Sequence, residues 1–173
     1  MDFSLPQAYL AGLLVLLSGA AVVVARQLLR VRRDEAALAR LEAQGRESEP
    51  SVAELYELGS VQLRKRLYGQ AVETLKRAAK RCSDEPLEAQ ALIENALGFA
   101  LAAQSNYTGA IRHYRSALKA KADYPVALNN LAFALEKQQK DDEARAAYEK
   151  VLELDSANRT AQKRLKRLNR LAA

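Results

Sequence analysis

Small residues recur at one position of three helix-like stretches, where an isolated helix would favour larger ones. Gly59, Gly98 and Ala132 mark this position, and the last two are 34 residues apart. Residues at fixed distances after each of them also match: Ala71, Leu75 and Ala78; Ala110, Tyr114 and Ala117; Ala144, Tyr148 and Val151. Glycine within a helix costs roughly 1 kcal/mol relative to alanine. The pattern therefore predicts three helical hairpins, whose helices cross closely at the small residues while the large residues fill the space beside them.

This pattern resembles the tetratricopeptide repeat (TPR), a helix–turn–helix unit of 34 residues. The resemblance covers residues 52–158 and implies an all-α solenoid of three units, approximately 52–85, 91–124 and 125–158. Five extra residues, "PLEAQ", separate the first two units. The aromatic residue that the family has early in the first helix of a unit is missing, and Leu55, Glu94 and Leu128 stand in its place.

The N-terminal region, residues 1–25, is predicted to be a transmembrane anchor. Residues 5–25 carry no charged side chain and are about long enough to cross a hydrocarbon core of ~30 Å as a helix. Arginines follow at 26, 30, 32 and 33, which places the C-terminal side in the cytoplasm or its organellar equivalent. A cleaved signal peptide is the alternative, but it would need positive charge before the apolar run.

Two further segments flank the repeats. Residues 26–50 are predicted to form a helical stalk that ends at Gly45 and a polar linker, with a coiled-coil dimer as the alternative. Residues 159–173 are predicted to form a basic capping helix, with Ala161, Leu165 and Leu168 facing the last unit. The segment holds six basic residues and no acidic one, which accounts for the net charge of +6. A second expectation is that Arg26, Arg30, Arg32, Arg33, Lys163, Arg164, Lys166 and Arg167 attract anionic lipid headgroups.

The concave surface of a TPR solenoid is lined mainly by the first helix of each unit, and the resemblance implies which residues form it here. They are Tyr56, Ser60, Leu63, Arg64, Asn95, Phe99, Ala102, Asn129, Asn130, Phe133 and Glu136. Asparagine both donates and accepts hydrogen bonds, which suits an extended peptide. The alternative for Phe99 and Phe133 is that they pack between helices. Clamps for an acidic chaperone tail need several basic residues where this chain has Tyr56, Ser60, Val126 and Asn130, so such a tail is not expected.

The sequence offers no pattern typical of an enzyme or a metal site. It contains a single His and a single Cys, and it lacks a P-loop, GxGxxG and HExxH. His113 is expected to point outward, and Cys82 is expected to pack as a small hydrophobic residue. The basic runs at 64–66, 76–81 and 163–167 invite a nucleic-acid interpretation, but they lack the interleaved aromatic residues that stack on bases.

The resemblance extends beyond the repeats. The segments "MDFSLP", "RQLLRVRR", "YELGS", "NALGFALAAQSNY", "AIRHYRSALK" and "YPVALNNLAFALEK" together resemble one family. It is the photosystem I assembly TPR family of cyanobacteria and plastids, named for hypothetical chloroplast reading frame thirty-seven. The resemblance implies a single-pass thylakoid protein with repeats on the cytoplasmic or stromal side, which assists photosystem I assembly or stability without catalysis.

The implied partners are photosystem I subunits or intermediates and other assembly factors. No cofactor, nucleic acid or small-molecule substrate is expected. A general bacterial membrane-anchored TPR adaptor for an envelope or secretion complex shares every physical feature and stays open as the alternative.

Overall fold

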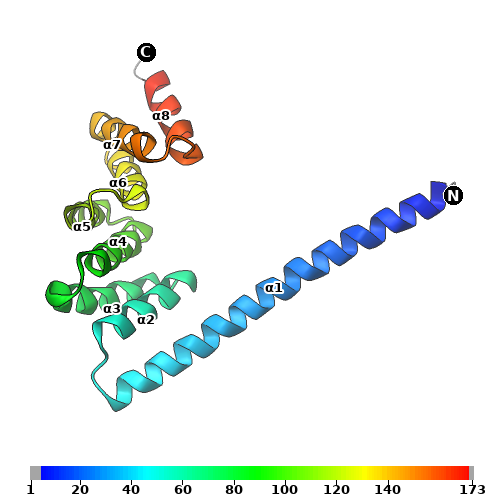
Figure 1. Cartoon of the computed structure of the whole chain (residues 1–173), viewed down its shortest axis with the longest axis horizontal. Coiled ribbons are helices and arrows are strands. Elements are labelled where there is room, and N and C mark those ends of the chain that lie inside the picture. Colours follow the sequence, from blue (N-terminus) through cyan, green and yellow to red (C-terminus); the bar gives the residue numbers. More distant parts are fainter. Residues whose placement is uncertain (1–4, 172–173) are drawn as a thin grey trace.

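The described residues, 5–171 of this computed structural model, contain helices and no strands (Figure 1). Residues 1–4 of the predicted anchor and 172–173 of the predicted cap lie outside the described residues. The helices are α1 (Leu5–Glu47), α2 (Val52–Arg64), α3 (Tyr68–Arg81), a short 3-10 turn (Cys82–Asp84), α4 (Leu87–Ala103), α5 (Tyr107–Ala120), α6 (Pro125–Lys137), α7 (Asp141–Leu154) and α8 (Arg159–Leu171).

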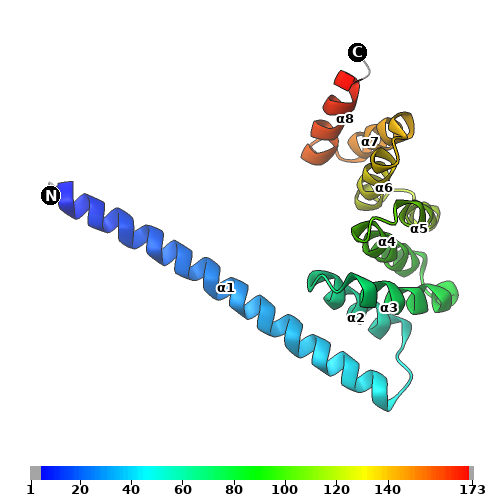
Figure 2. The same cartoon turned by 180° about the vertical axis from the view of Figure 1, so that it is seen from behind.

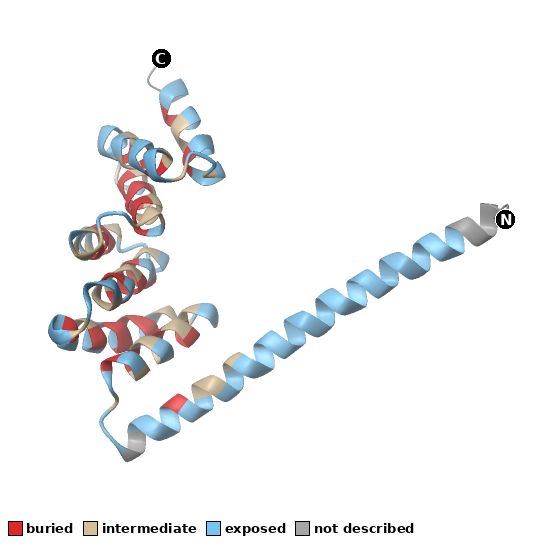
Figure 3. Ribbon diagram, in the orientation of Figure 1, coloured by how far each residue is buried: buried red, intermediate tan, exposed pale blue. Residues whose placement is uncertain are grey.

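The helices α2 to α8 stack as consecutive hairpins into a solenoid. The pairs α2–α3, α4–α5 and α6–α7 form the hairpins, and the second helix of each contacts the first helix of the next. Buried residues concentrate along these contacts (Figure 3). The predicted all-α array of hairpins is therefore confirmed.

The small residues lie where the paired helices approach most closely, as predicted. A Cβ atom built on Gly98 would lie 2.7 Å from two ring carbons of Tyr114 and 3.2 Å from the carbonyl oxygen of Ala110. A Cβ on Gly59 would lie 2.6 Å from Leu75. Tyr114 is almost completely buried, and this burial raises the pKa of its hydroxyl. The glycines thus let a large side chain of the second helix lie against the backbone of the first.

Each hairpin turn repeats one geometry that lacks glycine. Arg66, Ser105 and Gln139 have φ angles of 60°, 62° and 59°, in the left-handed region. In the second turn, the Asn106 amide donates to the Leu101 carbonyl and the Ser105 amide donates to that of Ala102. The same pair of bonds recurs in the other two turns, and together they form the Schellman arrangement that ends a helix. The sequence does not predict these caps, because glycine, their usual signal, is absent from the three turns.

The extra residues between the first two units are mostly helical. Pro86 precedes α4, and residues 87–90 form its first turn. The side-chain amide of Gln90 donates to the carbonyls of Ser83 (3.2 Å) and Glu85 (2.8 Å), which fixes the start of α4 against the preceding loop. The insertion therefore lengthens α4 to 17 residues.

The predicted anchor and stalk form one continuous helix, α1, of 43 residues. Residues 20–44 contain neither glycine nor proline, so nothing in this stretch favours a break. The C-terminal part of α1 packs on α2, where Leu41 is buried. Ion pairs join the two helices between Arg40 and Glu57 (2.7 Å), Asp34 and Arg64 (2.9 Å), and Glu35 and Lys65.

The connection from α1 to α2 is short and held at both ends. Arg81 of α3 donates to the Pro50 carbonyl (2.9 Å) and pairs with Glu49 (3.0 Å). Ser51 and Glu54 then form a capping box that starts α2. The Ser51 backbone amide donates to the Glu54 carboxylate at 2.8 Å, and the Glu54 backbone amide donates to the Ser51 hydroxyl at 3.2 Å. The segment predicted as a linker thus holds α1 against the first hairpin.

Candidate protein-binding surface

The first helices of the hairpins carry a row of partly exposed residues. Tyr56, Ser60 and Leu63 on α2, Asn95 and Ala102 on α4, and Asn130 on α6 are half-buried, and Arg64 is exposed. Phe99 has 45% of its surface exposed, so it does not pack between helices. We call this row the A-helix face. It offers aromatic, amide and small side chains together, the chemistry expected for binding an extended peptide segment.

Asparagines link neighbouring helices of the A-helix face. The Asn130 amide of α6 donates to the Asn95 carbonyl oxygen of α4 at 3.0 Å, and the Asn95 amide donates to the Tyr124 hydroxyl at 3.4 Å. Burial of Tyr124 raises the pKa of its hydroxyl. Because Asn95 and Asn130 hold each other, their remaining donor and acceptor positions are oriented before any ligand arrives.

Asn129, another predicted groove residue, serves an internal contact instead. Its amide donates to the Asn158 side-chain oxygen at 3.3 Å, and that oxygen also accepts from the Ala161 backbone amide at 3.1 Å. Asn158 is thereby the cap of α8. Asn129 therefore positions the last helix.

Phe133 and Glu136 are also engaged within the solenoid. The Phe133 ring meets Tyr107 edge to face with centroids 6.5 Å apart, and the Arg164 guanidinium lies 5.0 Å from its centroid. The Glu136 side chain is 4% exposed and pairs with Arg164 (3.2 Å) and Arg167. Of the two phenylalanines, Phe133 fits the packing alternative and Phe99 does not.

Two exposed apolar residues extend the A-helix face. Val126 stands at a position where a clamp for an acidic tail would need a basic residue, whereas Leu92 was not predicted to lie on this face. Leu92 lies seven residues before Phe99, and Val126 lies seven before Phe133, so each shares a helix face with its partner. Leu92 is 37% exposed and Val126 is 54% exposed. The seven-residue spacing between Leu92 and Phe99 could have indicated that both lie on the A-helix face. Leu92 is not at one of the positions that the family resemblance implies for this surface.

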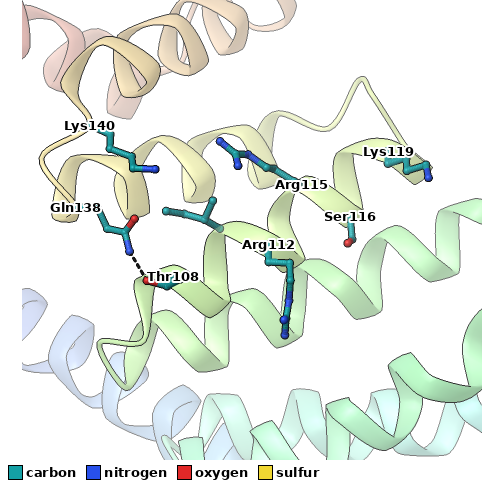
Figure 4. A pocket seen from close by; sticks show the side chains of 8 residues that line it. Thr108, Arg112, Arg115, Ser116, Lys119, Gln138 and Lys140 are labelled. Carbon is teal, nitrogen blue, oxygen red and sulfur yellow. Dashed lines mark hydrogen bonds between the residues drawn. The ribbon is translucent and has the colours of Figure 1, made fainter.

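A second surface, the basic hollow, lies between α5 and the turn that joins α6 to α7 (Figure 4). Its volume is about 430 Å³, and its lining residues are Thr108, Ile111, Arg112, Arg115, Ser116, Lys119, Gln138 and Lys140. Gln138 donates to the Thr108 hydroxyl at 2.6 Å, and Glu143 pairs with Arg115 (2.7 Å) and Lys140 (3.7 Å). Glu143 thus already neutralises part of the positive charge of the hollow.

The prediction that His113 points outward is wrong. Its Nδ1 lies 2.7 Å from a carboxylate oxygen of Glu94, and both side chains are less than one-fifth exposed. Glu94 stands at the position where the family has an aromatic residue, so a polar pair joins α4 to α5 in its place. Cys82 is buried beside Val52, Leu55 and Ala78, as predicted, and burial raises the pKa of its thiol.

The residues predicted to meet anionic lipid lie on the surface at two places. Arg26, Arg30, Arg32 and Arg33 are exposed on α1, and Lys163, Lys166 and Arg167 are exposed on α8, whereas Arg164 is half-buried beside Glu136. Within the described residues, α1 is the one helix long and apolar enough to cross a membrane. No residue of its apolar window is buried in the structure.

Family models match the second half of the chain. A TPR repeat model matches residues 98–139, and a tetratricopeptide repeat model matches residues 125–158. The solved first TPR domain of Spaghetti (RPAP3), bound to an HSP90 peptide, superposes with a TM-score of 0.64 at 22% identity. That match covers 70% of this chain and 94% of the solved domain.

Relatives from photosynthetic organelles match nearly the whole chain. The chloroplastic tetratricopeptide repeat domain-containing protein PYG7 of Arabidopsis thaliana is 32% identical over 163 residues. The match covers 94% of this chain and 54% of PYG7, so the chain spans about half the length of that relative. The uncharacterized protein ycf37 of Guillardia theta is 29% identical over 165 residues, covering 95% of this chain and 93% of the relative. With its stacked hairpins, the chain belongs to the tetratricopeptide-repeat family that includes the ycf37 and PYG7 proteins.

Proposed function

We propose that the chain is a non-enzymatic, membrane-anchored scaffold that binds photosystem I subunits or other assembly factors. The observation that carries the proposal is the A-helix face, a partly exposed row of aromatic, apolar and amide side chains on a preorganised solenoid. Binding to such a face loses little entropy in the protein, because the row is already ordered. The photosystem I client is the one that the family resemblance implies, and the plastid relatives support it.

The apolar first half of α1 supports the anchoring part of the proposal. Its charge-free segment is followed at once by four exposed arginines. This order favours insertion with the solenoid on the cytoplasmic or stromal side. Tethering raises the effective concentration of the A-helix face toward other membrane subunits. In a photosynthetic cell we expect that membrane to be the thylakoid.

Affinity isolation tests the A-helix face as the binding site. In the full chain, the double substitution Leu92→Ser and Phe99→Ser removes two exposed apolar contacts from the A-helix face. Since well-packed anchor residues contribute about 2 kcal/mol or more to binding, the yield of pigmented photosystem I intermediates from solubilised membranes should fall about tenfold or further. Pigment spectra and mass spectrometry of the co-isolated proteins measure the yield.

The matched control is the double substitution Leu87→Ser and Leu154→Ser, which removes two exposed leucines that lie off the A-helix face. The control should keep the wild-type yield. An unchanged yield with the Leu92→Ser and Phe99→Ser variant would show that the binding site is not on the A-helix face, and the basic hollow would be the next candidate. If the wild-type chain brought down envelope or secretion proteins without pigment, the photosystem part of the proposal would fail and the adaptor alternative would replace it.

A further inference from the structure

The exposed side of α8 carries a continuous stripe of positive charge. Arg159, Lys163, Lys166 and Arg170 recur at helical spacing and lie opposite Ala161, Leu165 and Leu168, which face the solenoid. Together with Thr160, Arg164 and Arg167 they line a hollow of about 810 Å³. We call Arg159, Lys163, Lys166 and Arg170 the α8 stripe. Among the described residues, none of the four forms an ion pair.

The neighbouring arginines explain why the stripe stays open. Arg164 and Arg167 turn toward Glu136 of α6, and this buried carboxylate is the acidic partner of α8. The two arginines thus fasten the helix to the solenoid. The α8 stripe is not needed for that attachment, so its charge is free for a partner outside the chain.

The solenoid and α1 form two arms that extend from one vertex, with α8 at the free end of the solenoid arm. In Figures 1 and 2, α1 and the solenoid form a V that closes at the α1–α2 contact. In Figure 1 both arms lead away from this vertex, α1 toward its N-terminus and the solenoid toward α8. Since α1 runs from Leu5 to Glu47, its middle lies at Arg26, where the apolar segment gives way to arginines. A membrane that begins at these arginines would therefore lie on the side of the vertex toward which the α8 end of the solenoid extends.

We propose that the α8 stripe binds anionic lipid headgroups, so that the chain contacts its membrane at two points, the span and α8. The inference depends on the anchoring part of the proposed function. Charge complementarity and position favour lipid over nucleic acid, because the stripe lacks aromatic residues for stacking on bases. Two attachments would hold the solenoid against the surface and fix the direction of the A-helix face.

Energy transfer in reconstituted bilayers tests the proposal. The full chain, with Cys82→Ala and a donor dye on Ala157→Cys in the turn before α8, is inserted into nanodiscs that carry acceptor dyes on their headgroups. Nanodiscs with anionic phosphatidylglycerol are compared with nanodiscs of neutral phosphatidylcholine. Each basic residue near an anionic surface favours the bound state about fivefold. Reversing two charges with Lys163→Glu and Lys166→Glu should therefore lower the ratio of bound to free α8 by more than about twentyfold.

The control reverses two exposed charges of α3, at the opposite end of the solenoid, with Arg77→Glu and Lys80→Glu. We expect high transfer with anionic lipid for the wild type and this control. The signal should fall as salt rises from about 50 to about 500 mM. Equal transfer with neutral and anionic lipid, or equal loss in both variants, would overturn the proposal. So would added RNA that binds the stripe and abolishes the transfer. A chain that fails to enter nanodiscs refutes the anchor itself, which is a separate outcome.

Discussion

At the residue scale, the packing of each hairpin depends on one small residue in its first helix, which faces a large residue in its second helix. Gly98 lets the Tyr114 ring lie 2.7 Å from the site of its missing Cβ, whereas the third hairpin has Ala132 and still buries Tyr148 completely. The third hairpin therefore accommodates a Cβ at the position where the second hairpin has none. The sequence predicted this small-to-large complementarity because both partners recur at fixed intervals.

Gly98→Ala should destabilise the solenoid by about 1–2 kcal/mol. Displacing Tyr114 from a filled core costs about 1–3 kcal/mol, and the better helix propensity of alanine offsets only part of that. The control is Gly69→Ala, whose added Cβ would lie 3.6 Å from the Gln104 side chain and should be neutral or stabilising. Urea unfolding followed by circular dichroism gives both values, and equal midpoints would show that Gly98 does not set the helix spacing.

Ser105→Gly should stabilise the chain by about 0.5–1 kcal/mol. A left-handed conformation costs an L-residue about 1–2 kcal/mol, and glycine avoids that cost while losing some entropy on folding. Ser105→Ala keeps a Cβ in the strained turn and should give no gain. Thermal unfolding midpoints compare the two variants. A gain of equal size from alanine would mean that the turn is not strained.

At the scale of the elements, contacts between helices determine the orientation of polar side chains that the sequence alone did not predict. The outward orientation predicted for His113 failed because its partner, Glu94, lies on another helix, 19 residues earlier. Asn129 was predicted to line the concave surface. In the structure, its amide donates a hydrogen bond to Asn158 in the α7–α8 turn. The helices themselves follow from local periodicity, but these polar contacts depend on how the hairpins stack.

The contact between α1 and α2 depends on Leu41, which is 4% exposed. Leu41→Asp should release the stalk, because an unpaired buried charge costs several kcal/mol and the three ion pairs across this contact contribute less than about 1 kcal/mol each. Limited proteolysis should then cut residues 45–51 at least tenfold faster, a change of ~1.4 kcal/mol in local opening. Ala36→Asp adds the same charge at an exposed stalk position and should leave the cutting rate unchanged. Equal rates in all chains would mean that Leu41 does not hold the stalk.

At the scale of the whole molecule, the sequence predicted the order of parts but not their mutual orientation. Composition predicted a long apolar first helix and a basic last helix, and the 34-residue period predicted the hairpins between them. The V between α1 and the solenoid was not predicted, because it is set by Leu41 and by ion pairs between residues 17 to 30 positions apart. The A-helix face was partly predicted. Its apolar member Leu92 emerged only from its exposure in the assembled solenoid.

Because α1 is one continuous helix, its apolar part and the solenoid are rigidly connected. In the membrane-anchored arrangement proposed above, α1 has no hinge between its apolar part and the part that packs on α2. A tilt of the span would therefore tilt the whole solenoid with it. A thinner bilayer, in which the span must lean further, would re-aim the A-helix face relative to neighbouring membrane proteins. Lipid composition would then govern which neighbours the solenoid can reach.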